Sequence, residues 1–141
     1  MAEVVLRAAL DAAGASDDVQ VDSAGTGDWH IGQSMNRGAL AALARRGYDG
    51  SAHRARQFSP SWFESRDLIL GMDSSNLADL RRACDPALKS RVRLFASAGS
   101  LTGVTDIPDP YGGGAEDFDH VLTLLEAAAP VIAAKLVAVR D

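Results

Sequence analysis

The chain has 141 residues, of which 47% are hydrophobic and 23% are charged. With 14 Lys and Arg against 19 Asp and Glu, its formal net charge is −5. This length is typical of one domain, so we treat residues 1–141 as a single unit. An acidic chain without a run of cations excludes a broad nucleic-acid or anionic-membrane surface, because both depend on clustered Lys and Arg.

The cysteine and histidine content predicts neither a disulfide nor a metal site. Cys84 is the single cysteine, which excludes an intramolecular disulfide and a cysteine-based zinc or iron–sulfur site. The three histidines are scattered, and we expect no metal and no cofactor. No apolar stretch approaches the roughly 20 residues of a membrane span. With no basic segment leading into an apolar N-terminal core, these features predict a cytoplasmic protein that binds no membrane.

Residues 1–14 predict an amphipathic helix. Their apolar side chains recur at helical spacing, and Gly14 is placed to end the helix in a left-handed conformation. No residue precedes Met1 to act as the N-cap of this helix, so we expect part of the domain to be missing before Met1. Residues 19–22 alternate in polarity and predict a short strand, which a glycine-rich loop over residues 23–32 follows.

The rest of the chain continues the alternation of helices and strands. We expect a helix over residues 36–46 with Leu40 and Leu43 on its buried side and Gly47 as its stop, and a strand over residues 67–71. A helix then opens at Asp73, a strand covers residues 91–95, and a last helix covers residues 116–139, bent at Pro130. This order predicts a three-layer α/β fold with a mostly parallel sheet, although three visible strands would make that sheet thin.

Four fragments of the sequence, in order, resemble the low-molecular-weight protein tyrosine phosphatases. They are Asp-Ser-Ala-Gly-Thr-Gly-Asp-Trp-His-Ile-Gly at 22–32, His-Arg-Ala-Arg-Gln at 53–57, Met-Asp-Ser-Ser-Asn-Leu at 72–77 and Asp-Pro-Tyr at 109–111. The resemblance covers nearly the whole chain. It implies a fold of the phosphotyrosine phosphatase I type, with a four-stranded parallel sheet and helices on both faces. It also implies metal-free hydrolysis of phosphotyrosine in proteins.

The reaction of that family has two steps. A cysteine thiolate in a C-x5-R loop attacks phosphorus, and the loop's backbone N–H groups and arginine cradle the phosphate at a helix N-terminus. The helix dipole and the guanidinium lower the pKa of such a thiol. An aspartic acid then protonates the leaving phenolate and, as a carboxylate, later activates the water that cleaves the phosphocysteine.

The sequence departs from this pattern at its start. The family places C-x5-R-S-P directly before Met-Ala-Glu, and this chain begins at that methionine. We therefore expect the first strand, the nucleophile and the phosphate-binding arginine to be missing, through truncation or a start assigned to an internal methionine, and the 141 residues to be inactive. Cys84 does not replace the nucleophile, because Cys84 to Arg91 is C-x6-R without a glycine. Its position indicates a helix end.

Three residues match groups that contact substrate in the family. Asp109 matches the general acid, whereas without the resemblance it would be interpreted as an aspartate that begins a turn before proline. Tyr111 matches an aromatic wall beside the phosphotyrosine ring, although Gly112 stands where the family often has a second tyrosine. Trp29 matches an aromatic residue that flanks the substrate.

Three further residues match groups that support the phosphate loop. Ser23 and His53 match residues whose hydrogen bonds buttress it, and the alternative for His53 is an ordinary surface histidine beside Arg54. Asp73 matches a supporting carboxylate at the carboxyl end of a strand, where open α/β sheets collect their site residues. It could equally be a helix N-cap, or both.

Two other functions remain to be weighed. Loss of the family's first strand would expose apolar strand edges, which favours a non-catalytic pseudophosphatase that binds partners or forms a homodimer. An arsenate reductase on the same fold would need several redox cysteines, and only Cys84 is present. The expected partner remains a tyrosine-phosphorylated protein.

Overall fold

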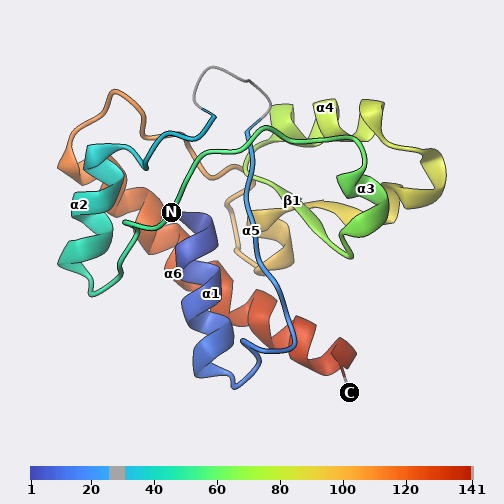
Figure 1. Cartoon of the computed structure of the whole chain (residues 1–141), viewed down its shortest axis with the longest axis horizontal. Helices are drawn as coiled ribbons and strands as arrows, with labels where there is room; N and C mark the ends of the chain where they lie inside the picture. The colour runs from blue at the N-terminus through green and yellow to red at the C-terminus, as the bar shows by residue number, and fades with distance from the viewer. Residues whose placement is uncertain (26–30, 141) are drawn as a thin grey trace.

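A computed structural model describes residues 1–25 and 31–140 of the chain. Its elements follow one another as α1 (Ala2–Ala12), α2 (Arg37–Arg45), α3 (Trp62–Ser65), β1 (Ile69–Gly71), α4 (Ser74–Ala83), the 3-10 helix η1 (Pro86–Arg91), β2 (Val92–Leu94), α5 (Phe95–Ala98) and α6 (Ala115–Arg140). Strands β1 and β2 pair in parallel, with Ile69 opposite Val92. The fold is α/β with a parallel sheet and helices packed against it (Figure 1).

Helix boundaries follow the capping residues of the sequence. Gly14 and Gly47, just beyond α1 and α2, both have positive φ, which glycine adopts without strain. The side chain of Asn36 accepts a hydrogen bond from Gly38 N and begins α2. Met1 occupies the N-cap position of α1 and provides no side-chain cap. These helices therefore lie where the sequence predicts them.

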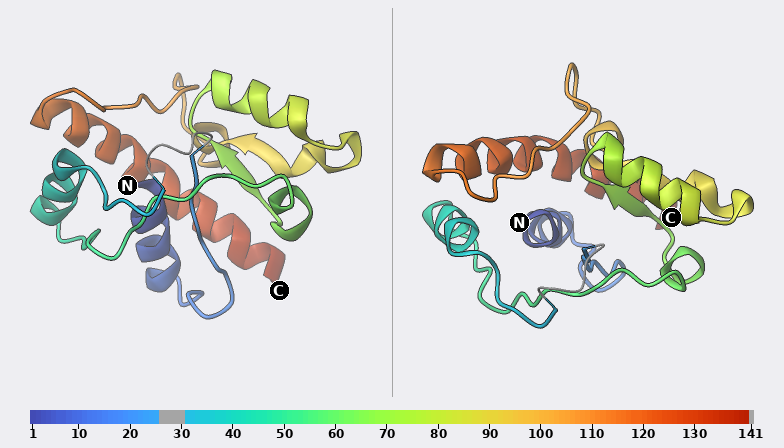
Figure 2. Two further views of the ribbon diagram at one scale, coloured as in Figure 1. Left: turned by 45° about the horizontal axis from the view of Figure 1, so that its top comes forward. Right: turned by 90° about the horizontal axis from the view of Figure 1, so that it is seen from above.

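The long helix α6 carries the core. Its buried residues recur at helical spacing, and α1, α2 and α5 pack on it (Figures 1 and 2). The largest fully buried side chains of this core are Leu10, Leu43, Phe95, Leu122, Leu125 and Ile132. A smaller apolar cluster around Phe63, Cys84 and Val92 lies on the side of α3 and β2.

The length and composition of α6 correct one expectation. An 18-residue window within Ala115–Val139 has a mean hydropathy of 1.9, so this helix is long and apolar enough to cross a membrane by those criteria alone. The sequence prediction that no such stretch exists was wrong, because α6 continues past Pro130 and joins the apolar residues on both sides of this proline into one helix. In the structure 39% of that window is buried, and Ala128, Ala129 and Ile132 pack in the core almost fully buried.

Residues 19–22 also differ from expectation. They run extended beside β1 (Figures 1 and 2) but make no strand ladder in the described part of the chain, where the sheet has two strands rather than three. A strand exists only through hydrogen bonds to a neighbour. The first ladder contact of this segment comes later, at Gly25, which forms a parallel bridge with Gln57.

Candidate active site

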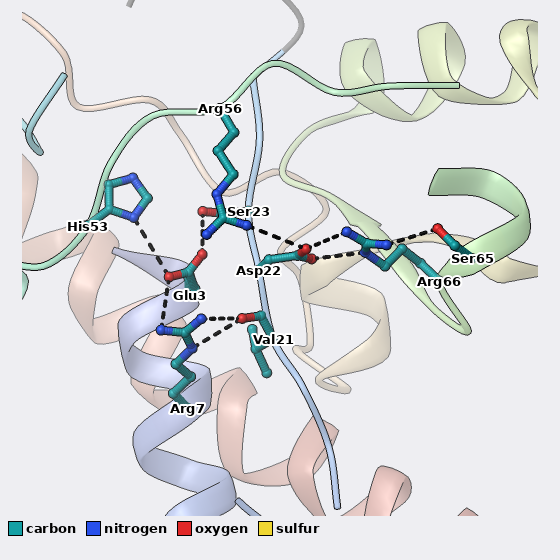
Figure 3. A network of polar contacts seen from close by, with 9 residues as sticks. All are labelled: Glu3, Arg7, Val21, Asp22, Ser23, His53, Arg56, Ser65 and Arg66. Carbon is teal, nitrogen blue, oxygen red and sulfur yellow. Dashed lines mark hydrogen bonds and ion pairs between the residues drawn. The ribbon is translucent and has the colours of Figure 1, made fainter. Parts of the chain in front are cut away.

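The buried carboxylate of Glu3 joins two of the predicted supporting residues (Figure 3). Glu3 lies in the first turn of α1 and is 9% exposed. Ser23 donates its hydroxyl hydrogen to Glu3 Oε1 at 2.9 Å, and His53 Nδ1 lies 3.8 Å from Glu3 Oε2. Arg7, one turn further along α1, approaches the same Oε2 at 3.4 Å. Ser23 and His53, 30 residues apart in sequence, thus meet at one carboxylate.

His53 is held as a neutral imidazole by its surroundings. Burial lowers the pKa of His53 below its usual value, and the negative charge of Glu3 only partly opposes that effect. A neutral ring at pH 7 accepts at one nitrogen and donates at the other. His53 is therefore suited to a hydrogen-bonding role rather than to holding a permanent positive charge.

A second part of the network fixes Asp22, the neighbour of Ser23. Arg66 donates two hydrogen bonds to the Asp22 carboxylate, from Nε to Oδ1 at 3.2 Å and from Nη2 to Oδ2 at 2.6 Å (Figure 3). Arg56 approaches from the other side at 3.8 Å. The guanidinium of Arg66 also stacks 4.2 Å from the ring centroid of Trp62. Asp22 is thus held by Arg66, which lies 44 residues away in the sequence.

Sequence reasoning missed the partners in this network. Glu3 had a detectable signal, because it shares a helix face with Leu6 and Leu10 at spacings of three and seven residues, where a charge is unexpected. Arg66 gave no local signal. Only the tertiary structure brings it to Asp22.

Asp73 is the N-cap of α4. Its carboxylate accepts a hydrogen bond from Asn76 N at 2.7 Å, directly after β1 ends. This geometry is that of a capping residue, one of the two interpretations the sequence left open. In the described chain no hydrogen bond or ion pair joins Asp73 to Ser23 or His53.

Asp109 and Tyr111 lie together on an exposed loop before α6. Asp109 Oδ1 accepts a hydrogen bond from Tyr111 N at 3.0 Å, which closes a turn of three residues, 109–111. Tyr111 is 71% exposed. The loop borders a hollow of about 170 Å³ next to the first turns of α6, whose lining includes Pro108, Asp109, Pro110, Tyr111, His120 and Val121.

Comparison with known proteins decides the family. Residues 1–140 match the family described as low molecular weight phosphotyrosine protein phosphatase. The chain belongs to this family. The sequence resemblance is thereby confirmed at the level of the family.

Relatives and solved structures agree with that assignment. A low molecular weight protein-tyrosine-phosphatase of Streptomyces coelicolor is 42% identical over 144 residues, spanning all of this chain and 85% of the relative. Protein-tyrosine phosphatase A of Mycobacterium tuberculosis is 34% identical over 130 residues, spanning 92% of this chain and 78% of the relative. A crystal structure of a protein tyrosine phosphatase from Entamoeba histolytica superimposes with a TM-score of 0.92 at 28% identity, covering 99% of this chain and 89% of that one.

Cys84, the one cysteine of the sequence, is buried at the end of a helix. It is the C-cap residue of α4 and only 6% exposed, with Phe63 and Val92 in the smaller apolar cluster. Its Sγ contacts the carbonyl oxygen of Asp85 at 3.3 Å. A reactive thiolate needs nearby positive charge or free N–H groups together with solvent access, and this surrounding is apolar.

Two further predictions concern residues that this geometry does not address. Trp29 falls within residues 26–30, outside the described part of the phosphatase chain. Among the residues that are described, no group of three or more His, Cys, Asp or Glu side chains could hold a metal ion.

Proposed function

We propose that the protein hydrolyses phosphotyrosine monoesters in proteins, with Asp109 as the general acid. The observation that carries this proposal is the family match combined with the Asp-Pro-Tyr loop, which keeps the carboxyl group of Asp109 exposed beside Tyr111. An acid that gives a proton to a leaving phenolate has to face the substrate. The exposed ring of Tyr111 offers a flat apolar surface for the phenyl group.

The polar network around Glu3 supports a division of roles. In the proposed mechanism Ser23 and His53 support the loop that binds phosphate, and Glu3 fixes both side chains from the first turn of α1. Trp29, as in the sequence prediction, is proposed to flank the substrate. Asp73 holds the start of α4 at the carboxyl end of β1, the sheet edge where α/β enzymes bind ligands.

We further propose that the 141 residues by themselves are inactive. The reaction of the family needs a cysteine in a C-x5-R loop, and the single cysteine present, Cys84, lies at C-x6-R spacing in an apolar cluster. Loss of a covalent nucleophile lowers turnover by roughly a million-fold in a serine protease. We expect an effect of at least this order.

Hydrolysis of p-nitrophenyl phosphate tests both parts of the proposal. The 141-residue chain should give no turnover above background, and the Cys84→Ser variant should match it. Joining a strand followed by C-x5-R-S-P in front of Met1 should produce turnover, which Asp109→Asn should then reduce by a factor of about 10² to 10⁴. Turnover by the unmodified chain that Cys84→Ser abolishes would contradict the inactivity and assign the nucleophile to Cys84.

A non-catalytic binding module is the second candidate. It is favoured by residues 19–22, which run extended beside β1 without joining its ladder. Strand edges pair readily with another chain, and within this segment Val19 N and the carbonyl oxygen of Val21 already have partners, in Ala15 and Arg7, so pairing would use the remaining backbone groups. Sedimentation velocity would show a concentration-dependent dimer in this case, whereas a folded monomer at all concentrations would exclude self-association.

We propose a cytoplasmic location and a tyrosine-phosphorylated protein as the partner. The location rests on the single cysteine, which suits a reducing compartment. Fractionation of cells that express a tagged chain tests it.

A further inference from the structure

Asp106 ties the loop that carries Asp109 to the start of a different element, α4. One oxygen of its carboxylate, Oδ1, accepts two hydrogen bonds from Ser74, from the backbone N at 3.0 Å and from Oγ at 2.8 Å. The two residues are 32 positions apart in sequence. Hydrogen bonds to a charged acceptor are stronger than those between neutral groups.

The next residue, Ile107, makes a second attachment at the same place. Its backbone N donates to the carbonyl oxygen of Met72 at 2.7 Å, and its side chain is only 3% exposed in the main core. Met72 lies between the end of β1 and the beginning of α4. Three hydrogen bonds and one buried side chain thus fix residues 106–107 to the β1–α4 junction.

Little conformational freedom remains between this attachment and Asp109. A single residue, Pro108, separates Ile107 from Asp109, and Pro110 follows Asp109. Each proline ring fixes its own φ and restricts the residue before it. After Pro110, the backbone N of Tyr111 donates a hydrogen bond to the Asp109 carboxylate. The place of the Asp109 carboxyl group is therefore set mainly by where residues 106–107 are held.

Two aspartates share the free N–H groups at the start of α4, and their roles differ. Asp73 caps the helix from the adjoining position by accepting from Asn76 N, as an ordinary N-cap does. Asp106, 32 residues away in the sequence, accepts a hydrogen bond from Ser74 N. Because Asp73 already caps α4, the hydrogen bonds that Asp106 accepts from Ser74 mainly fix the position of the segment that carries Asp106.

We propose that Asp106 is a positioning residue that holds Asp109 in place through Ser74. The catalytic meaning of this role rests on the proposed function of Asp109, but the attachment itself can be tested without any turnover. Asp106 is exposed and lies outside the core, so its removal should leave the fold intact.

The test compares Asp106→Ala with Asp73→Ala in the 141-residue chain by NMR. Asp106→Ala should raise the hydrogen-exchange rate of the Ile107 amide about tenfold or more and broaden the amide signals of residues 109–112. Asp73→Ala should accelerate exchange in α4 and leave Ile107 and the loop unchanged. The amide of Leu122, fully buried in α6, serves as the reference for global opening.

Variants of Ser74 provide an independent check. Ser74→Thr keeps the hydroxyl donor and should retain the exchange rate of Ile107 within about twofold, whereas Ser74→Ala should raise it. The proposal is overturned if Asp106→Ala and Asp73→Ala accelerate the same α4 amides and leave the loop unchanged, since Asp106 would then be only a second cap. It is equally overturned if Asp106→Ala has no effect on Ile107. Neither result depends on whether Asp109 proves to be the general acid.

Discussion

The residues proposed to support phosphate binding and the residue proposed to transfer a proton are held in opposite ways. Ser23 and His53 converge on the buried Glu3, and their neighbour Asp22 is gripped by Arg66. Asp109, by contrast, is exposed on a loop. A supporting residue works by not moving, whereas a proton donor has to face both substrate and water. Long-range polar contacts therefore hold Ser23, His53 and Asp22 directly. Asp109 is held through the attachment of Asp106 at the base of its loop.

The largest expected effect comes from removing the centre of the network. Glu3→Ala should lower the free energy of unfolding by about 2–3 kcal/mol, because it leaves the partly buried Ser23 hydroxyl without its acceptor and His53 without the neighbouring carboxylate. Glu3→Gln keeps an oxygen for Ser23 and should lose less. Urea denaturation measures both variants. A loss below about 0.5 kcal/mol for Glu3→Ala would show that the network is not what fixes these residues.

A smaller loss should follow from changing the grip on Asp22. Arg66→Lys keeps the positive charge but loses the two-pronged contact and the stacking on Trp62, so we expect a loss of about 1 kcal/mol in unfolding free energy. The exposed Arg37 offers a matched control, since Arg37→Lys should change stability by less than about 0.5 kcal/mol. Equal effects of the two substitutions would argue against a specific role for Arg66.

The lowered pKa of His53 predicts that the free energy of unfolding depends on pH. Because burial lowers this pKa in the folded state, the unfolded chain binds the proton more readily. Stability should therefore be complete above the unfolded pKa of about 6.5 and fall as the pH drops from there toward the folded pKa. The slope cannot exceed about 1.4 kcal/mol per pH unit. The slope should be smaller in His53→Gln, where only the Met1 amine, whose pKa burial also lowers, still contributes, and it should persist in a variant of the exposed His120. Urea denaturation between pH 5 and 8 measures it.

The smallest effect on stability is expected at Asp109. Asp109→Asn retains an oxygen to accept from Tyr111 N, so the unfolding free energy should change by less than about 0.5 kcal/mol. Asp22→Asn should cost more in the same assay, since it removes a charge paired with Arg66. If Asp109→Asn were the more destabilising of the two, the contrast between the polar network around Glu3 and Asp22 and the exposed loop of Asp109 would fail.

Most of the helices could be predicted from local signals. Gly14 and Gly47 end helices because they adopt positive φ, and Asn36 and Asp73 begin them because their side chains accept backbone N–H groups. The strand predicted at residues 19–22 failed for a physical reason. Alternating polarity gives a segment the potential to pair, but pairing needs a neighbour, and local sequence does not contain that neighbour.

The site divides along the same line. The motif around Asp109 and Tyr111 could be found because its residues are adjacent in sequence and match a family pattern. Arg66, which fixes Asp22, and Asp106, which fixes the loop of Asp109, carry no such pattern. Their partners lie 44 and 32 residues away, respectively.

By itself the sequence determined the family, the helices and the chemical identity of the proposed acid, because these depend on residue types, short spacings and capping preferences. Only the tertiary structure decided that Glu3 joins Ser23 to His53, that Cys84 is enclosed in an apolar cluster, and that Asp106 is bonded to Ser74. The physical reason is that burial and hydrogen-bond partners depend on which distant segments meet. That meeting follows from packing of the main core on α6 and of the smaller apolar cluster around Phe63, Cys84 and Val92, rather than from any local pattern.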